Sequence, residues 1–141
     1  MIELKFRIPG ECRGKMRPKA SAFGGHAKVY TPAKQVEYEN WVRLCFKNAF
    51  PDFEPIEAGR PIEAHISVFL AVPQSFSKKK RKEALEGIIK PTKKPDVDNA
   101  AKSVLDSLNG IAFHDDAQIV WLRVDKAYGN ESWVDVELIA D

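Results

Sequence analysis

The chain has 141 residues, of which 44% are apolar, and a formal net charge of +2. This length suits one domain, residues 1–141, and the apolar content argues against disorder. The longest apolar run, residues 66–73, is too short to cross a membrane, and the N-terminus has no signal-peptide pattern, so we expect a cytoplasmic protein without a membrane partner. Cys12 and Cys45 have no metal-type spacing and are expected to be reduced thiols.

The first half of the chain alternates regular and irregular segments. Residues 2–8 alternate apolar and polar side chains, which predicts a half-buried strand. Residues 10–30 are rich in glycine and basic residues and predict a long basic loop or a poorly formed hairpin, a kind of segment that usually binds something. Thr31 followed by Pro32 predicts the start of a helix that runs to about Phe50. Its expected apolar stripe comprises Val36, Trp41, Leu44 and Cys45, with Tyr38 and Phe46 as further members.

The second half predicts two helices and three strands. Residues 62–72 form a strand whose end is apolar on both faces, which favours a central position. Ser77 caps a short basic helix through Leu85, and another helix follows Asp98 and stops at residues 109–110. Residues 118–127 and 132–139 form strands that residues 129–130 join as a hairpin. The order β-α-β-α-α-β-β predicts an α/β (α+β) fold, a small mixed β-sheet with helices packed on it.

Charge is distributed unevenly along the chain. Residues 75–94 hold eight basic residues against two glutamates, whereas acidic residues predominate from Asp106 onward. On charge alone, a polyanionic partner and a solvated basic helix explain this pattern equally well.

Two aspartates one residue apart, Asp96 and Asp98, precede the last predicted helix. Asp98 alone is explained as a helix cap, but Asp96 lies outside the helix and shares a side with Asp98 if the chain is extended there. Asp115 and Asp116 lie in the turn before the next strand, which can return toward the same end of the sheet. Converging carboxylates repel one another without a cation, and Mg²⁺ favours such oxygen ligands. The pattern therefore predicts a magnesium site that activates water against a phosphodiester.

The neighbouring residues narrow this prediction. A calcium-binding EF-hand is excluded, because Ala101 and Ser107 stand where that loop needs glycine and glutamate. Lys102 follows Asp98 by one helical turn and is either its ion-pair partner or a cation for the scissile phosphate or the attacking water. Asp106, one turn further along, is either a supporting partner or solvated. His114 precedes the acid pair, but an oxygen-rich site favours magnesium over metals that prefer imidazole.

Three motifs resemble those of a known nuclease family: PDVDNAAK at 95–102, DSL at 106–108 and FHDDAQ at 113–118. Together with YTP at 30–32 and the pair at 37–38, they resemble the RusA-type Holliday junction resolvases, small magnesium-dependent endonucleases of phages, prophages and bacteria. The resemblance implies that Asp96 and Asp98 are catalytic, that Asp116 is the third metal-binding acid and that Lys102 is needed for cleavage, with Asp115 as a neighbour. It also implies Mg²⁺ with Mn²⁺ as a substitute, four-way junction DNA, a homodimer and no nucleotide cofactor.

Two basic segments, residues 10–28 and residues 78–94, are expected to bind DNA phosphates. Such contacts give an affinity that falls with salt and little sequence preference. A two-fold dimer would present two acid sites to opposed strands of a junction. The alternatives are a DNA-binding module without cleavage, which leaves the acids without a purpose, and a nuclease of the same chemistry that acts on other branched DNA. The candidate DNA-binding residues are Arg13, Lys15, Arg17, Lys19, Lys78, Lys79, Lys80, Arg81, Lys82, Lys93 and Lys94.

Overall fold

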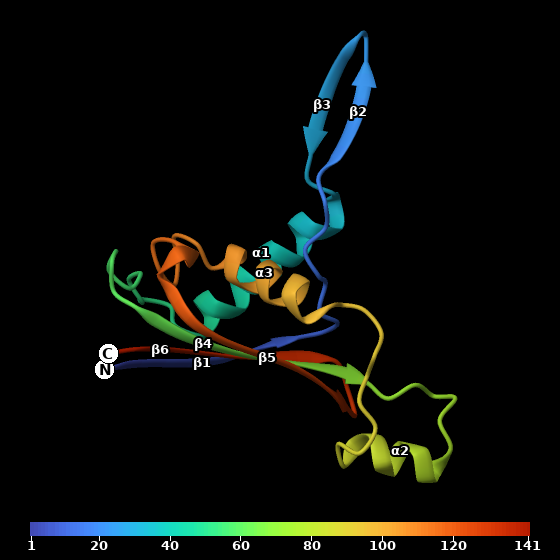
Figure 1. Cartoon of the computed structure of the whole chain (residues 1–141). Helices are drawn as coiled ribbons and strands as arrows, with labels where there is room; N and C mark the ends of the chain where they lie inside the picture. The colour runs from blue at the N-terminus through green and yellow to red at the C-terminus, as the bar shows by residue number, and fades with distance from the viewer.

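A four-stranded sheet runs through the centre of the molecule (Figure 1). The structure is a computed structural model that describes residues 1–141, apart from the side chains of Ser21, Phe23 and His26. The strand order is β1 (Ile2–Pro9), β6 (Trp133–Ala140), β4 (Ile62–Ala71) and β5 (Ile119–Gly129). β4 pairs in parallel with β5, and the other two pairings are antiparallel. This confirms the predicted mixed fold of helices on a small mixed sheet.

Alternation of side chains gives the sheet one buried face. Leu4, Phe6 and Ile8 of β1 are buried, and every second residue of β4 from Ile62 to Leu70 is buried as well. β6 alternates in the same way, from Val134 to Ala140. Because side chains of a strand point to opposite faces in turn, these residues form one continuous apolar surface, as the period-2 pattern of residues 2–8 predicted.

The prediction of a hairpin between the last two strands is wrong. β4 lies between β5 and β6, so the two strands that follow each other in sequence do not pair. The connection instead crosses the end of β4, where Val72 donates a backbone hydrogen bond to the carbonyl of Gly129. Ala71 donates to the hydroxyl of Ser132 in the same connection. These bonds fix the crossover and leave β5 at the edge of the sheet.

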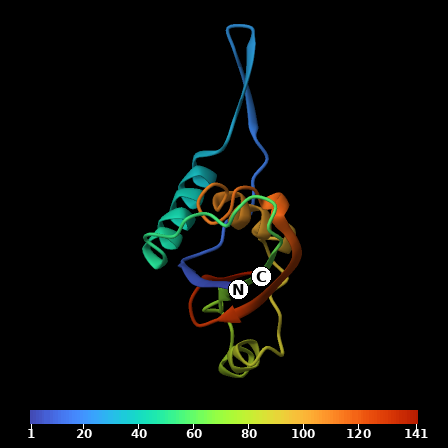
Figure 2. The ribbon, with the colours of Figure 1, turned by 90° about the vertical axis from the view of Figure 1, so that its left-hand side faces the viewer.

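Two helices cover the buried face, as Figure 2 shows from the side. They are α1 (Ala33–Ala49) and α3 (Val97–Ser107). The apolar stripe predicted for α3 is buried, at Ala101, Val104, Leu105 and Leu108. The stripe predicted for α1 is wrong in part, because Val36, Trp41 and Leu44 are at least 40% exposed. The buried face of α1 consists of Gln35, Tyr38, Val42 and Phe46.

Two smaller elements project from opposite sides of the sheet (Figures 1 and 2). The hairpin β2 (Lys19–Phe23) and β3 (His26–Tyr30) rises on the side of α1 and α3. It confirms the hairpin alternative predicted within residues 10–30, and residues 11–18 before it form an irregular segment. The basic helix α2 (Lys78–Leu85) lies on the other side, with Ser77 accepting a hydrogen bond from the backbone N–H of Lys80, as its capping role predicted. No helix among the described residues is long and apolar enough to cross a bilayer.

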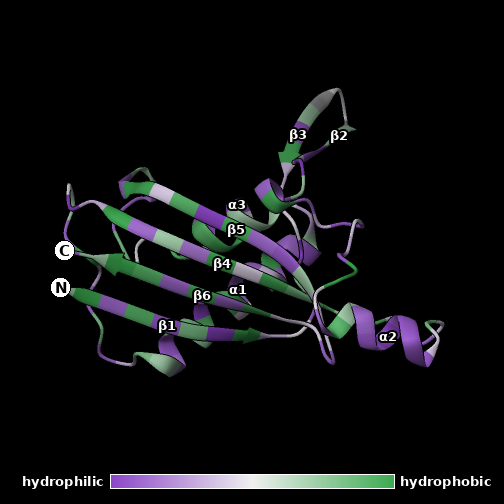
Figure 3. Cartoon of the chain, turned by 60° about the horizontal axis from the view of Figure 1, so that its bottom comes forward, coloured by the Kyte–Doolittle hydropathy of each residue, from purple (hydrophilic) through white to green (hydrophobic). Residues whose placement is uncertain are grey.

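The second face of the sheet, away from α1 and α3, is turned toward the viewer in Figure 3. Phe69 and Trp133 stack there with ring centroids 4.4 Å apart, and the guanidinium of Arg7 lies 4.6 Å from the Trp133 ring. Arg7 also pairs with Asp135, at 2.8 Å. Trp121, a candidate for core or interface, is 48% exposed and packs against His65, with ring centroids 5.0 Å apart.

Candidate active site

Helix α3 begins two residues earlier than the sequence predicts. It starts at Val97, so Asp96 is the N-terminal flanking residue and Asp98 lies in the first turn. Both carboxylates are exposed, and an acidic residue in the first turn interacts favourably with the helix dipole. Val97 and Asp98 are helical, so the extended stretch under which Asp96 and Asp98 would share one side does not form.

A groove between α3 and β5 brings three of the four candidate catalytic residues together. Asp98, Lys102 and Asp116 all line it, and its volume is about 640 Å³. Asp98 and Lys102 share a face of α3 because they are four residues apart, as the spacing predicts. Asp116 opens the short 3-10 helix at Asp116–Gln118, directly before β5. The remainder of the groove is largely apolar and includes Val97, Ala101, Leu105, Val120 and Leu122.

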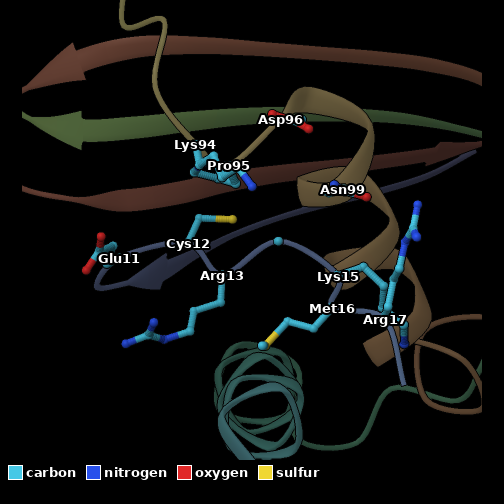
Figure 4. A pocket seen from close by; sticks show the side chains of 11 residues that line it. Glu11, Cys12, Arg13, Lys15, Met16, Arg17, Lys94, Pro95, Asp96 and Asn99 are labelled. Atoms are coloured by element: carbon cyan, nitrogen blue, oxygen red, sulfur yellow. The ribbon is translucent and has the colours of Figure 1, made fainter. Parts of the chain in front are cut away.

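Asp96 lies at a second cavity of about 600 Å³ on the other side of the start of α3. Arg13, Arg17 and Lys94 line the same cavity, which gives it a basic character. In Figure 4 the carboxylate of Asp96 is directed away from the side chains of the loop that forms the opposite wall. Asp96 therefore lines the cavity that adjoins the groove, and whether it acts together with Asp98 stays a prediction.

Asp106 lies closer to the centre of the acid cluster than the sequence suggested. Its carboxylate is 3.2 Å from the ammonium of Lys15 and 3.7 Å from that of Lys102. The carboxyl group of Asp116 is a further close neighbour, and each of the two groups shifts the pKa of the other. Burial raises the pKa of Asp106, but the hydrogen bond from Asp116 and the neighbouring lysines outweigh burial and hold this pKa below its ordinary value.

The opposite shift occurs at Asp116. Its hydrogen bond to Asp106 raises the pKa of Asp116, and burial and the charges of Asp106 and Asp115 add to the effect. The two carboxyl groups therefore influence each other in opposite directions, as close neighbours do.

Gln118 holds the turn that carries Asp115 and Asp116, a role that the sequence analysis missed. Its side-chain oxygen accepts hydrogen bonds from the backbone N–H groups of His114 and Asp115, at 3.0 and 3.1 Å. Its amide group donates to the carbonyls of Glu57 and Arg60, at 2.8 and 3.0 Å. Asn109 adds a further bond by accepting from the backbone N–H of Asp116, at 2.8 Å. Its position in the DDAQ motif is the one sequence signal that pointed to Gln118.

The donor set of the groove fits a hard divalent cation. Among the described side chains, no three His, Cys, Asp or Glu residues converge closely enough to enclose an ion. Mg²⁺ does not need such a cage, because it is commonly held by one or two carboxylates, waters and substrate phosphates. Asp98 and Asp116 supply two carboxylates at one groove, and the exposed His114 contributes only its backbone N–H to the turn.

Comparison with known proteins gives the family. The family model described as endodeoxyribonuclease RusA matches residues 9–139. The chain belongs to this family. It is also similar to a protein of Bacillus subtilis (strain 168) described as uncharacterized protein YqaN, with 38% identity over 135 residues, which cover 94% of this chain and 93% of the relative. Membership of the RusA family indicates an endodeoxyribonuclease, a hydrolase of DNA phosphodiesters.

The basic residues of this RusA family member flank the acid groove on two sides. Figure 1 shows that α3 begins between the β2–β3 hairpin and α2. The link from α2 to α3 is tied to the sheet where the ammonium of Lys126 donates to the carbonyl of Lys93, at 2.6 Å. Lys15 differs from the other candidates, because its ammonium lies close to two carboxylates, whereas that of Lys82 lies 3.9 Å from Glu86 alone. Arg81 is half-buried, and the exposed candidates are Arg13, Arg17, Lys19, Lys78, Lys79, Lys80, Lys82, Lys93 and Lys94.

Proposed function

We propose that this protein is a magnesium-dependent, structure-selective endodeoxyribonuclease that resolves Holliday junctions in DNA recombination and repair. Residues 1–141 act as one endonuclease domain, and two copies form a homodimer. The observation that carries the proposal is the groove lined by Asp98, Lys102 and Asp116, which lies between two basic elements in a chain of the RusA family.

Each residue of the groove has a distinct task in this proposal. Asp98 and Asp116 hold the metal ion, and Mn²⁺ can replace Mg²⁺ there. A metal ion held by these two residues would supply a water molecule of lowered pKa and positive charge beside the scissile phosphate. Lys102 binds a non-bridging oxygen of that phosphate, and the carboxylate of Asp106, 3.7 Å away, keeps its ammonium at the groove. Asp115 supports the turn that presents Asp116.

The basic segments supply affinity. Exposed lysines and arginines at the base of the hairpin and on α2 bind phosphates without reading bases, so they position branched DNA over α3. A two-fold dimer then presents one groove to each of two opposed strands, which permits paired cleavage of a four-way junction.

The deciding experiment compares a synthetic four-way junction with a linear duplex of the same sequence, with and without Mg²⁺. With Mg²⁺, we expect paired nicks in opposed strands of the junction and little cleavage of the duplex. Without Mg²⁺, we expect no cleavage of either substrate. Equal cleavage of both substrates would remove the junction preference, and preferred cleavage of flaps or forks would assign another branched substrate. Binding without cleavage in Mg²⁺ and Mn²⁺ would reduce the protein to a DNA-binding module.

Two matched variants test the acid site. Asp98→Asn should abolish cleavage while junction binding survives, because the carboxylate holds the metal and the basic residues hold the DNA. Asp96→Asn decides whether the other aspartate of the motif is a metal ligand, since it lies at the adjoining cavity. A fall in metal affinity equal to that of Asp98→Asn would make it a ligand. Full cleavage by Asp98→Asn would contradict the proposed site.

A further inference from the structure

Lys15 is the one member of the candidate DNA-binding set that contacts two carboxylates from two different helices. Its ammonium lies 3.0 Å from Glu39 of α1 and 3.2 Å from Asp106 of α3. The side chain of Lys15 is 27% exposed, and those of its two partners are 15% and 20% exposed. Burial lowers the pKa of Lys15, but both carboxylates outweigh burial and hold that pKa above its ordinary value. An ammonium has three donors, so two are already committed to the protein.

The backbone around Lys15 is fixed as firmly as its side chain. The N–H of Lys15 donates to the carbonyl of Asn99, at 2.9 Å, and the N–H of Met16 donates to the side chain of Gln35, at 3.0 Å. Gly14 allows this close approach, because a Cβ atom there would lie only 3.2 Å from the Cβ atoms of Pro95 and Asn99. The loop at residues 10–18 therefore packs closely against the start of α3, at Pro95 and at Asn99, the residue after Asp98.

Gln35 connects these contacts to the helix core. It is fully buried, and its amide group donates to Glu39 at 3.1 Å and to the hydroxyl of Ser103 at 3.2 Å. Because a buried amide needs such partners, α1, α3 and the loop are held by one connected set of polar contacts. Lys15 joins this set through Glu39 and extends it to Asp106.

Asp106 carries the influence of Lys15 to the candidate catalytic residues. The same carboxylate that lies 3.2 Å from the ammonium of Lys15 lies 3.7 Å from that of Lys102, and Asp106 also raises the pKa of the neighbouring Asp116. The loop at residues 10–18 leads through Arg17 into β2, so the ion pairs of Lys15 link the segment that carries the hairpin to Asp106.

We propose that Lys15 is a positioning residue that joins the loop and the β2–β3 hairpin to the acid groove, by holding Asp106 in place against Asp116 and Lys102. The inference rests on the proposed nuclease function. In this role Lys15 does not bind a DNA phosphate. When DNA binds to the hairpin, the contacts of Lys15 keep Asp116 and Lys102 correctly placed relative to the strand that is cut. Positional errors of about 1 Å at a reacting group can cost about 100-fold in rate, which sets the expected size of the effect.

The test measures three quantities on four-way junction DNA for Lys15→Met, which keeps the length of the side chain and removes its charge. These are the cleavage rate at saturating DNA with Mg²⁺, the affinity without metal, and the slope of log affinity against log salt. We expect the rate to fall by about 10- to 100-fold, while affinity and salt slope stay at their wild-type values. Lys15→Arg, which can still pair with both carboxylates, should recover most of the rate.

Two controls give the expected patterns for other roles. Lys19→Met removes an exposed charge at the start of β2 and should lower both affinity and salt slope, as a phosphate contact does. Lys47→Met removes an exposed charge from the far end of α1 and should change none of the three quantities. If Lys15→Met lowers the salt slope by about 0.9 unit with an unchanged rate, Lys15 is a phosphate contact and the inference is overturned.

A double-mutant cycle covers the case in which Lys15→Met folds poorly. Asp106→Asn removes the partner on α3, and Lys15→Gln removes the charge of Lys15 but keeps a polar end group. If Lys15 acts through Asp106, Lys15→Gln combined with Asp106→Asn should be no slower than Asp106→Asn alone. Losses that multiply would overturn the inference. A wild-type protein that cleaves no DNA would refute the proposed function, whereas a wild-type nuclease that tolerates Lys15→Met would refute the inference alone.

Discussion

Replacing Gln118 with alanine tests how the turn with Asp115 and Asp116 is held. Gln118 is 9% exposed. Its side chain makes four hydrogen bonds, to the backbone N–H groups of His114 and Asp115 and to the carbonyls of Glu57 and Arg60. Alanine at this position leaves two N–H groups and two carbonyls without these partners. Each such bond contributes about 1 kcal/mol net, and each unsatisfied group that stays buried costs about 1–3 kcal/mol.

The expected loss is about 3–4 kcal/mol of the free energy of unfolding. This loss is near the lower end of the summed cost of four unsatisfied backbone groups. The reason is that these backbone groups are only partly buried, so water can reach some of them. Since small proteins have only about 5–15 kcal/mol of stability in total, the variant should fold but unfold at a clearly lower urea concentration. With a urea slope of about 1.5 kcal/mol per M, the midpoint should fall by about 2 M.

Urea unfolding followed by tryptophan fluorescence measures this loss. Gln74→Ala, at an exposed position, is the matched control and should change stability by less than about 0.5 kcal/mol. A loss below about 1 kcal/mol for Gln118→Ala would refute the view that this side chain holds the turn. The same variant should also cleave DNA poorly, because Asp116 is no longer fixed beside the groove.

Further predictions concern Lys102, the two thiols and α2. Lys102→Ala should slow cleavage by about 100-fold with little change in metal affinity, and a loss of thermal stability alone would make it a simple ion-pair partner. Burial raises the pKa of the Cys12 thiol to about 11, so at pH 8 Cys45 should react with a thiol reagent in the folded protein and Cys12 only on unfolding. Equal reaction rates of the two thiols would contradict this difference in burial. Because that pKa is raised in the folded state, stability should fall by on the order of 1 kcal/mol per pH unit as pH rises above the ordinary thiol pKa of 9.0, which urea unfolding can measure. Replacing Lys78, Lys79 and Lys80 with glutamine should lower the salt slope of DNA binding by up to about 3 units, and an unchanged slope would exclude α2 from the contact.

The sequence predicted those features that depend on local periodicity. The strand at residues 2–8, the basic helix after Ser77 and the apolar face of α3 all followed from alternation, capping and helical spacing, and all are confirmed. The common face of Asp98 and Lys102 also followed from their spacing of four residues. The motif match to the RusA family is confirmed by the family comparison.

Features that depend on tertiary contacts were missed or wrong. The buried face of α1 contains Gln35, and polarity alone excluded that residue from the predicted stripe although three neighbours satisfy its amide. The sequence predicted a hairpin of β5 and β6 because the two strands are adjacent in sequence. The insertion of β4 between them depends on the whole sheet. The contact of Asp106 with Asp116 likewise joins a helix to a later turn, and no spacing rule reveals it.

The position of β6 determines the time at which this protein can fold during synthesis. β6, at residues 133–140, lies in the interior of the sheet between β1 and β4, and β1 pairs with β6 alone. The first strand to leave the ribosome therefore waits, with one apolar face and both edges open, until β6 has also left the exit tunnel. Pairing between residues this far apart in sequence is slow, since the whole intervening chain must be closed into a loop. Nascent chains that stop before residue 133 would thus carry a complete acid motif on an incomplete sheet, so a partial product is a substrate for chaperones and proteases before it can reach DNA.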